Sequence, residues 1–432
     1  MHRTIVRSMA GATAAFVVLT VGPPAGASDI AHTNVASETP ATFTPHLYAN
    51  GFRPYASTIN QAGDQMVVGG RFNAVENSAR NQTYTRSNVF AFNRFTGAVN
   101  QAFDPVLNGQ VWSVLGNGDD VYIAGEFSTV NGVTRNRVAK LSVSTGEVDL
   151  DFNATAAIKG GRATDLELKG GRLWVSGAFG RKLVALNPDT GALLPYSTIP
   201  VTDPLRYTNR VEVFRFDISP DGTKLVAVGN FQTVDGQRRH RAFMLDLGAG
   251  GATLSPWYYT PLERECHAAA VAPVYQYYIK DVDFSPNSQF FTFASTGGHR
   301  INGEGPGQVL CDSAARFSVS NLSPTVPYWI NYTGGDTLHS VIDTGAAVYV
   351  QGHSRWLDNP YGADYAGPGA VDRLGGGAID PVTGKALPWD PAMPQTKGGY
   401  QMFANEQGVW FATDGLRFGG KYKRGLRLAP VG

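Results

Sequence analysis

The hydrophobic positions of this chain fall into short runs of strand-forming residues that end at turn signals. Four of these runs, "QMVVG", "VYIAG", "LWVSG" and "LVAVG", each lead into a Gly-x-Phe sequence, and each is followed by a second short hydrophobic run. Short β-branched runs between Gly, Asn-Gly and Asp-Gly signals predict β-strands joined by tight turns. The chain shows no long amphipathic helical stretch and no heptad pattern, so we expect an all-β protein.

This pattern recurs at a nearly fixed period. The phenylalanines of the four Gly-x-Phe sequences lie 55, 52 and 52 residues apart: Phe72, Phe127, Phe179 and Phe231. Looser copies of the unit follow at 290–298, 347–356 and 408–418. A unit of four short strands is too small to bury its own faces, so it must pack against its neighbours. We therefore expect a seven-bladed β-propeller of four-stranded antiparallel blades, forming one domain over residues 41–432.

The last unit is one strand short, because the chain ends after "GLRLAPVG". The N-terminal stretch "ATFTPHLY" resembles the outer segments of other units, such as "QAFDPVL". We expect residues 41–48 to complete the seventh blade and close the ring as an N-terminal strand. Closure of this kind removes the open edge that a linear array would expose. Residues 28–40 are expected to form a leader segment.

The N-terminus has the pattern of a secretory signal peptide. Two arginines precede a mostly apolar stretch over residues 8–21, and Ala25-Gly26-Ala27 fits the small-x-small cleavage rule. We expect cleavage after residue 27 and an extracellular location. The apolar stretch is too short and too broken by Gly, Ser and Thr to span a bilayer. No later stretch reaches 18 uninterrupted apolar residues, so no membrane insertion is expected.

The net charge limits the classes of partner that we expect, and the two cysteines indicate a disulfide. Residues 1–27 carry two arginines and no acid, so the 36 bases of the chain become 34 against 35 acids. A net charge of this size exerts no long-range attraction on nucleic acid or an anionic membrane. We expect a monomer that binds an extracellular polysaccharide or protein. Cys266 and Cys311 are expected to form a disulfide in an exported chain, the alternative being two buried free thiols.

The unit "GEFSTVNGVTRNRVAKL" at 125–141, with its copies, resembles the repeat of the delta-60 repeat β-propellers of secreted bacterial proteins. The resemblance covers residues 60–245 by motif, and from about 250 onward it rests on the period. It implies a propeller fold and a secreted protein. The family has no common catalytic residue that could be transferred to this chain.

The repeated unit carries an arginine pair that admits two interpretations. Arg135 and Arg137 follow an Asn-Gly turn, and Arg238, Arg239 and Arg241 take their place about a hundred residues later. A basic ligand-binding cluster is one interpretation. We favour a structural role, in which these arginines bind turn carbonyls of an adjacent blade, because guanidinium offers five donors in a fixed fork. Functional sites are rarely copied once per repeat.

Function is more naturally sought where the repeat is broken. Three insertions lengthen the units at 259–276, 297–315 and 352–377, and propeller topology places all three on one face. A bridge between the two cysteines would join the first two insertions. The candidate ligand-binding residues on this face are His267, His299, Arg300, Glu304, His353, Arg355, Trp356, Asp358, Tyr361, Asp364 and Tyr365. No catalytic residue is assigned, and no cofactor is expected apart from calcium.

Two alternatives to a ligand site on this face remain open. The insertions could simply plug the mouth of the channel and pack on each other. The predicted inner strands also carry charges toward the axial channel: Asp165, Glu167, Arg215, Asp217, Asp281 and Asp283. A water-filled channel with solvated carboxylates is the simpler interpretation. The other is a divalent cation held by carboxylate and carbonyl oxygens, with calcium expected outside a cell.

Two functional hypotheses follow from these patterns. The first is a non-catalytic extracellular or cell-envelope-associated module that binds its ligand on the loop-rich face of blades four to six. The second is a lyase or glycosidase on the same face, with Asp358 and Glu304, or His299 and His353, as participants. Such an enzyme needs two titratable groups about 5–10 Å apart across an open cleft. The common metalloprotease, serine-hydrolase and phosphate-loop motifs are absent from the sequence.

Overall fold

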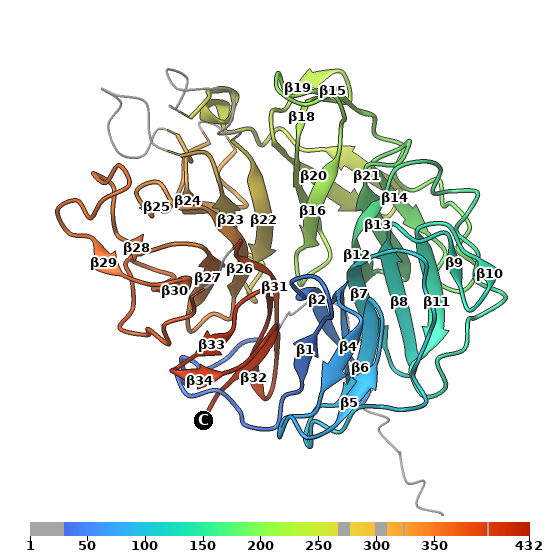
Figure 1. Ribbon diagram of the computed structural model, residues 1–432. Helices are drawn as coiled ribbons and strands as arrows, with labels where there is room; N and C mark the ends of the chain where they lie inside the picture. Colours follow the sequence, from blue (N-terminus) through green and yellow to red (C-terminus); the bar gives the residue numbers. More distant parts are fainter. Residues whose placement is uncertain (1–29, 267–276, 299–308, 323–324, 395–396) are drawn as a thin grey trace, which may run out of the picture.

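The computed structural model describes residues 30–266, 277–298, 309–322, 325–394 and 397–432. In these residues the protein is all-β apart from one short 3-10 helix, η1 (Thr260–Glu263). The sheets follow each other around a common centre, so that the first and the last lie side by side (Figure 1). No helix in the described part of the chain is long and apolar enough to cross a membrane.

The sheets are antiparallel meanders of three or four strands. In chain order they begin with β2 (Tyr55–Ala62), β3 (Gln65–Arg71), β6 (Val89–Asn93); β7 (Val111–Asn117), β8 (Asp120–Gly125), β11 (Val138–Ser142); β12 (Ala163–Lys169), β13 (Arg172–Gly177), β14 (Leu183–Leu186); and β16 (Val213–Ile218), β17 (Lys224–Gly229), β20 (Ala242–Gly248), β21 (Gly251–Leu254). They continue with β22 (Ile279–Phe284), β23 (Phe290–Ser295), β24 (Ser313–Ser318), β25 (Trp329–Tyr332); β26 (Leu338–Asp343), β27 (Val348–Gly352), β30 (Gly376–Ile379); and β31 (Gly399–Asn405), β32 (Gly408–Thr413), β35 (Leu426–Pro430).

Short additional strands extend several second-to-third-strand connections. They are β4 (Ala74–Glu76), β5 (Thr83–Thr85), β9 (Thr129–Val130), β10 (Val133–Thr134), β18 (Phe231–Val234), β19 (Gln237–Arg238), β28 (Trp356–Leu357), β29 (Val371–Asp372), β33 (Arg417–Phe418) and β34 (Lys421–Tyr422). The two remaining strands pair with members of this group, β1 (His46–Tyr48) with β4 and β15 (Val201–Pro204) with β18. Isolated bridges such as Leu141↔Val148 occur where a three-stranded sheet would gain its fourth strand.

The repeated Asn-Gly turn and the phenylalanine of Gly-x-Phe have structural roles. Asn131 and Gly132 both adopt positive φ, of 50° and 77°, as the type I′ hairpin turn requires. Phe127 is fully buried and belongs to a hydrophobic cluster that includes Val89 of β6 and Ile123 of β8. The core therefore lies between neighbouring sheets, so each sheet depends on the next for its stability.

The repeated arginines are structural, although one detail of the prediction is wrong. Arg135 donates from Nη2 to the carbonyl oxygens of Asp149 (3.1 Å) and Leu150 (3.2 Å). Arg137 donates to the carbonyl oxygen of Phe127 (3.2 Å). These acceptors belong to the same unit as the arginines, not to an adjacent blade. The chain that follows the third strand folds back past the hairpin and presents its carbonyls there.

The first strands of the sheets form an inner layer. Each contacts the first strand of the next sheet, and β31 of the last sheet contacts β2 of the first. The backbone N–H of Ile59 on β2 donates to Oε1 of Gln401 on β31 (3.3 Å). We refer to β2, β7, β12, β16, β22, β26 and β31 as the inner strands.

The N-terminal segment packs along the last sheet. Ser37 donates its backbone N–H to Pro430 (2.7 Å) and Ala41 donates to Leu428 (2.9 Å), both on β35. The pairing involves residues slightly earlier than the predicted 41–48, because residues 46–48 form β1 and pair with β4 instead. Residues 30–40, predicted as a leader, thus share the contacts with the last sheet.

Candidate functional site

Every inner strand has a β-bulge at the same place. One residue of the inner strand has no partner on the second strand of its sheet, and a bulge of this kind re-aims the extra side chain. The seven bulged residues are Ser57, Trp112, Thr164, Phe214, Lys280, His339 and Tyr400. The backbone irregularity repeats, whereas the side chain at the bulge differs in every unit.

Six of the bulged residues converge on one cavity of about 240 Å³, which we call the mouth cavity. It lies near the N-terminal ends of the inner strands, and Ser57 is the bulged residue that does not line it. The cavity is lined by Trp112, Arg162, Thr164, Glu212, Phe214, Arg215, Lys280, His339 and Tyr400. It combines three cations, one carboxylate and several aromatic rings.

Two of the three cations have a carboxylate partner. Arg162 binds Glu212 with two parallel hydrogen bonds, from Nε to Oε1 (2.6 Å) and from Nη2 to Oε2 (3.1 Å). Its guanidinium also lies over the ring of Trp112, 5.2 Å from the centroid. Arg215 donates from Nη1 to Oδ1 of Asp165 (3.0 Å). These pairs hold both guanidinium groups in place, since planar bidentate and charge-assisted bonds restrict their orientation.

The third cation, Lys280, is held differently. Its half-buried ammonium lies 5.3 Å from the ring centroid of Phe214 and 5.4 Å from that of Tyr278. Burial lowers the pKa of this ammonium, and the carboxylate of Glu212 acts in the opposite direction. Within the described residues the ammonium has neither a hydrogen-bond acceptor nor an ion-pair partner.

Aromatic rings form much of the remaining wall. Tyr400 stacks on Tyr55 with 4.7 Å between ring centroids. The ring of His339 lies 6.5 Å from Tyr400 and 5.9 Å from His353. Burial lowers the pKa of His339 to about 3, so this imidazole is neutral at ordinary pH. His353 links the mouth cavity to the insertion at 352–377.

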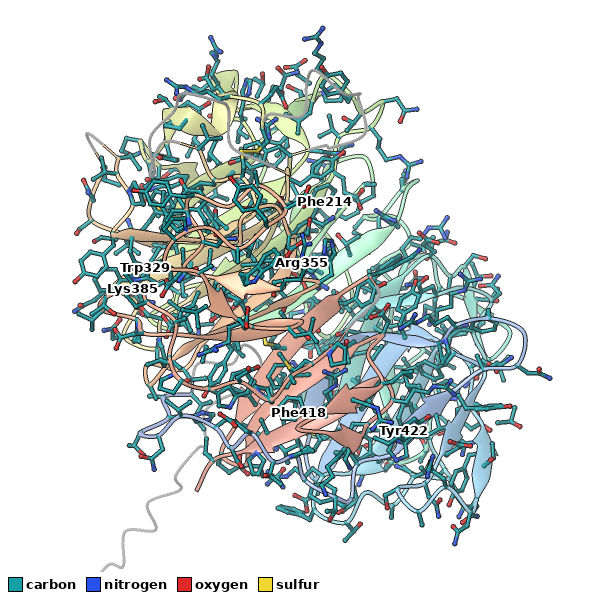
Figure 2. The ribbon with its side chains drawn as sticks, turned by 60° about the vertical axis from the view of Figure 1, so that its left-hand side comes forward. Phe214, Trp329, Arg355, Lys385, Phe418 and Tyr422 are labelled. Atoms are coloured by element: carbon teal, nitrogen blue, oxygen red, sulfur yellow. A yellow bond between two sulfur atoms is a disulfide. The ribbon has the colours of Figure 1, made fainter. Side chains whose placement is uncertain are left out.

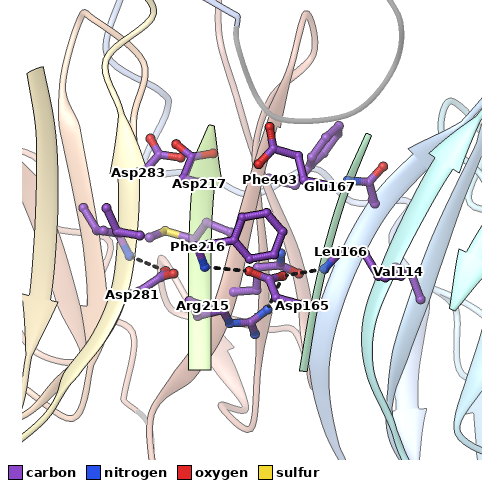
Figure 3. Close-up of a pocket in the computed structure, with 15 residues that line it drawn as sticks. Val114, Asp165, Leu166, Glu167, Arg215, Phe216, Asp217, Asp281, Asp283 and Phe403 are labelled. Atoms are coloured by element: carbon purple, nitrogen blue, oxygen red, sulfur yellow. Dashed lines mark hydrogen bonds and ion pairs between the residues drawn. The ribbon is translucent and has the colours of Figure 1, made fainter. Parts of the chain in front are cut away.

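Further along the inner strands from the mouth cavity, a smaller pocket of about 70 Å³ contains the channel carboxylates that the sequence predicted (Figure 3). They accept backbone N–H groups of the next inner strand. Asp281 binds Val341 (3.0 Å) and Asp165 binds Phe216 (3.2 Å). Glu167, Asp217 and Asp283 make the corresponding bonds to Ile218, Phe284 and Asp343. The carboxylates therefore join neighbouring sheets.

These bonds bear on the calcium hypothesis. Within the described residues, no group of three or more His, Cys, Asp or Glu side chains is arranged to hold a metal ion. Burial raises the pKa of Asp281 to about 7, and burial with the neighbouring Asp217 raises that of Asp283 well above its usual range. Calcium in the channel stays a prediction.

The raised pKa of Asp281 predicts a pH-dependent stability. The unfolded chain releases this proton near pH 4, whereas the folded protein retains it to about pH 7. Stability should therefore fall as pH rises between these values, since the folded state binds more protons. Asp281→Asn should remove this loss and exceed the wild type in unfolding free energy at pH 8 by a few kcal/mol. Urea unfolding at pH 5 and 8 measures it, with the exposed Asp151→Asn as control.

The structure brings together some of the predicted loop residues. The disulfide is confirmed: Cys266 and Cys311 are bonded, with 5.6 Å between Cα atoms, and join the first two insertions. The other candidates in these insertions, His267, His299, Arg300 and Glu304, lie outside the described residues. The geometry of the proposed pairs Asp358–Glu304 and His299–His353 is therefore not defined.

In the third insertion, Arg355 organises the loop (Figure 2). It binds both carboxylate oxygens of Asp336, with Nη2 to Oδ1 at 2.7 Å, and also contacts Oδ1 of Asp364 at 3.1 Å. Its guanidinium lies 4.4 Å from the ring centroid of Trp356. Arg355 and Trp356 thus form one packed cluster. Asp358 accepts hydrogen bonds from a side-chain amide and a backbone N–H group, which gives it a structural role.

Tyr361 and Tyr365 are 56% and 58% exposed, so they are the solvent-exposed aromatic candidates of this loop. Sequence reasoning missed the bulged residues. Their signal is present: each follows a small or apolar residue at the start of an inner strand, as in "VWS", "VFR", "IKD" and "LHS". This sequence signal can be recognised only when the inner strands are aligned with one another.

Comparison with known proteins agrees with a propeller-like all-β fold. Residues 120–152 match the family described as "Domain of unknown function (DUF5122) beta-propeller". No curated protein matches the chain significantly.

Two solved structures align with most of the chain. One is the extracellular domain of BT4673, a candidate one component system of B. thetaiotaomicron, at 11% identity and a TM-score of 0.45. That alignment covers 90% of this chain but 40% of the other. The second is the computationally designed Ika8 protein, at 11% identity, a TM-score of 0.46, and coverage of 89% and 99%.

Proposed function

We propose that this protein is a secreted, non-catalytic β-propeller of the delta-60 repeat type that binds an extracellular ligand at the mouth cavity. The proposed ring has seven blades, and the N-terminal segment closes it beside β35. Support for seven blades comes from the bulge, which recurs once in each of seven inner strands. Support for closure comes from the β2–β31 contact and from the bonds of Ser37 and Ala41 to β35.

One observation carries the proposed binding function. The bulged position has the same backbone geometry in each sheet, but its side chains are Trp, Thr, Phe, Lys, His and Tyr around one cavity. A purely structural position in a repeat tends to keep its residue type, as the buried Phe of Gly-x-Phe does. A concave site with aromatic walls and a few polar groups is the usual form of a ligand pocket.

The enzyme hypothesis has no comparable support. A glycosidase would need two carboxyl groups free to act across the cavity. Glu212 is the acidic residue that lines the mouth cavity, and its carboxylate is bound at both oxygens by Arg162. We therefore propose binding without catalysis.

Removal of two aromatic side chains that line the mouth cavity tests whether it is the binding site. A defined panel of immobilised polysaccharides and peptides is first screened for a ligand that the wild type binds. The Trp112→Ala/Tyr400→Ala double variant should bind that ligand with at least tenfold lower affinity. Both side chains are half-buried, so the variant should still fold, which circular dichroism checks. The matched control is Tyr361→Ala/Tyr365→Ala, which removes two exposed aromatics of the third insertion.

Binding of the two variants to the panel distinguishes a site in the mouth cavity from a site on the third insertion. Binding that is lost in the control and kept in the mouth variant would move the site to the insertion. Failure of the wild type to bind any neutral or acidic polysaccharide or peptide of the panel would contradict the proposed binding function.

A further inference from the structure

The charges around the mouth cavity do not balance. Arg162 is neutralised by Glu212, and Arg215 by Asp165. Lys280 is left with two aromatic rings and no anionic partner in the described part of the chain. A half-buried charge without a counter-ion is destabilising, because burial removes water that no protein dipole replaces. An anionic ligand would restore this lost interaction.

Because the two neighbouring guanidinium groups are paired with carboxylates, the mouth cavity favours a ligand group with a single negative charge. Each guanidinium group lies against a carboxylate, Arg162 against Glu212 and Arg215 against Asp165, so the ammonium of Lys280 is the one positive charge of the lining without such a partner among the described residues. A monoanionic carboxylate balances one uncompensated ammonium charge, whereas a phosphate dianion would leave a negative charge in excess. The indole N–H of Trp112 is buried without an acceptor, which adds a demand for ligand oxygen close by.

The walls indicate what carries the carboxylate. Trp112, Phe214 and Tyr400 line the cavity with flat faces, which favour a ring over an extended aliphatic chain. Drug-sized ligands occupy pockets of roughly 300–1,000 Å³. At about 240 Å³ the mouth cavity is smaller and suits one ring. An acceptor-rich ring bearing one carboxylate is an acidic sugar residue.

We propose that the mouth cavity recognises a uronate residue of an acidic polysaccharide, with the Lys280 ammonium as the group that binds its carboxylate. This inference rests on the proposed binding function at the mouth cavity. Lys280 is the contact that distinguishes an acidic sugar from its neutral counterpart, while the aromatic rings bind either one.

The test is isothermal titration calorimetry of the full chain with trigalacturonate and with its methyl ester, which has the same shape without the charge. The wild type should bind the acid at least tenfold more tightly than the ester. Lys280→Met should remove this difference and still bind the ester, which shows that the variant is folded. Lys421→Met, at an exposed lysine of β34, should behave as the wild type.

Three results would overturn the inference: no binding of trigalacturonate to the wild type, equal affinity for acid and ester, or an acid preference that survives Lys280→Met. A sulfated galactose trisaccharide that binds as tightly as the uronate would also contradict the carboxylate assignment. If both sugars lose affinity in the Trp112→Ala/Tyr400→Ala variant while Lys280→Met has no effect, the binding site stands and its proposed chemistry fails.

Discussion

Deletion of residues 30–50 is expected to lower the melting temperature by about 5 °C or more, because the segment contributes several kcal/mol to the last and first sheets. Leu47 is fully buried in a cluster with Trp410 and Leu428. The ammonium of Lys423 donates to the carbonyl oxygen of Thr42 and to Thr44 Oγ1, both at 3.0 Å. Deletion exposes this apolar surface and leaves a mostly buried ammonium without acceptors.

A point variant separates packing from gross truncation. Leu47→Ala should cost about 2–5 kcal/mol in unfolding free energy, as large-to-small changes in a core do. Tyr48→Ala, on the adjacent and partly exposed position of β1, should cost less than about 1 kcal/mol. Calorimetric melting of the three proteins measures both effects. An unchanged melting curve for the deletion would refute closure of the ring by this segment.

Arg241→Met is expected to destabilise the protein by about 3 kcal/mol or more. Arg241 is 1% exposed and donates to the carbonyl oxygen of Tyr277 (3.0 Å), to that of Leu262, and to both carboxylate oxygens of Glu265. Its removal leaves buried carbonyl groups without donors, each of which costs about 1–3 kcal/mol. These bonds join β20 to the link that leads into β22.

The matched control lies three residues earlier. The side chain of Arg238 is 71% exposed and forms an ion pair with Glu263. Arg238→Met should change the unfolding free energy by less than about 1 kcal/mol, as for other surface pairs. Denaturant unfolding compares the two. Similar costs for both variants would contradict the assignment of this arginine cluster to the architecture.

The repeat made the fold predictable. Turns such as Asn131-Gly132 and buried residues such as Phe127 depend on local sequence and a period of about 55 residues, so they could be predicted without knowing how the sheets meet. The acceptors of Arg135 were misplaced because their position depends on how the chain folds back after the third strand. The N-terminal pairing was shifted because β4 competes for residues 46–48.

The candidate site was much less predictable. Insertions are visible in the sequence because they lengthen a repeat unit. The residues that line the mouth cavity instead occupy regular positions of the repeat and leave its length unchanged. Trp112, Lys280 and Tyr400 lie in three distant units, and only the shared bulge turns them toward one another. A bulge has no simple sequence signature, so their convergence follows from the backbone register. The disulfide was predictable because two cysteines permit only one pairing.

The most direct test of the mouth cavity as the binding site is a crystal structure of the full chain with trigalacturonate. The account predicts one sugar ring against Trp112 and Tyr400, with its carboxylate within hydrogen-bonding distance of Lys280 Nζ. A trisaccharide bound on the exposed Tyr361 and Tyr365 surface, with the mouth cavity empty, would contradict it.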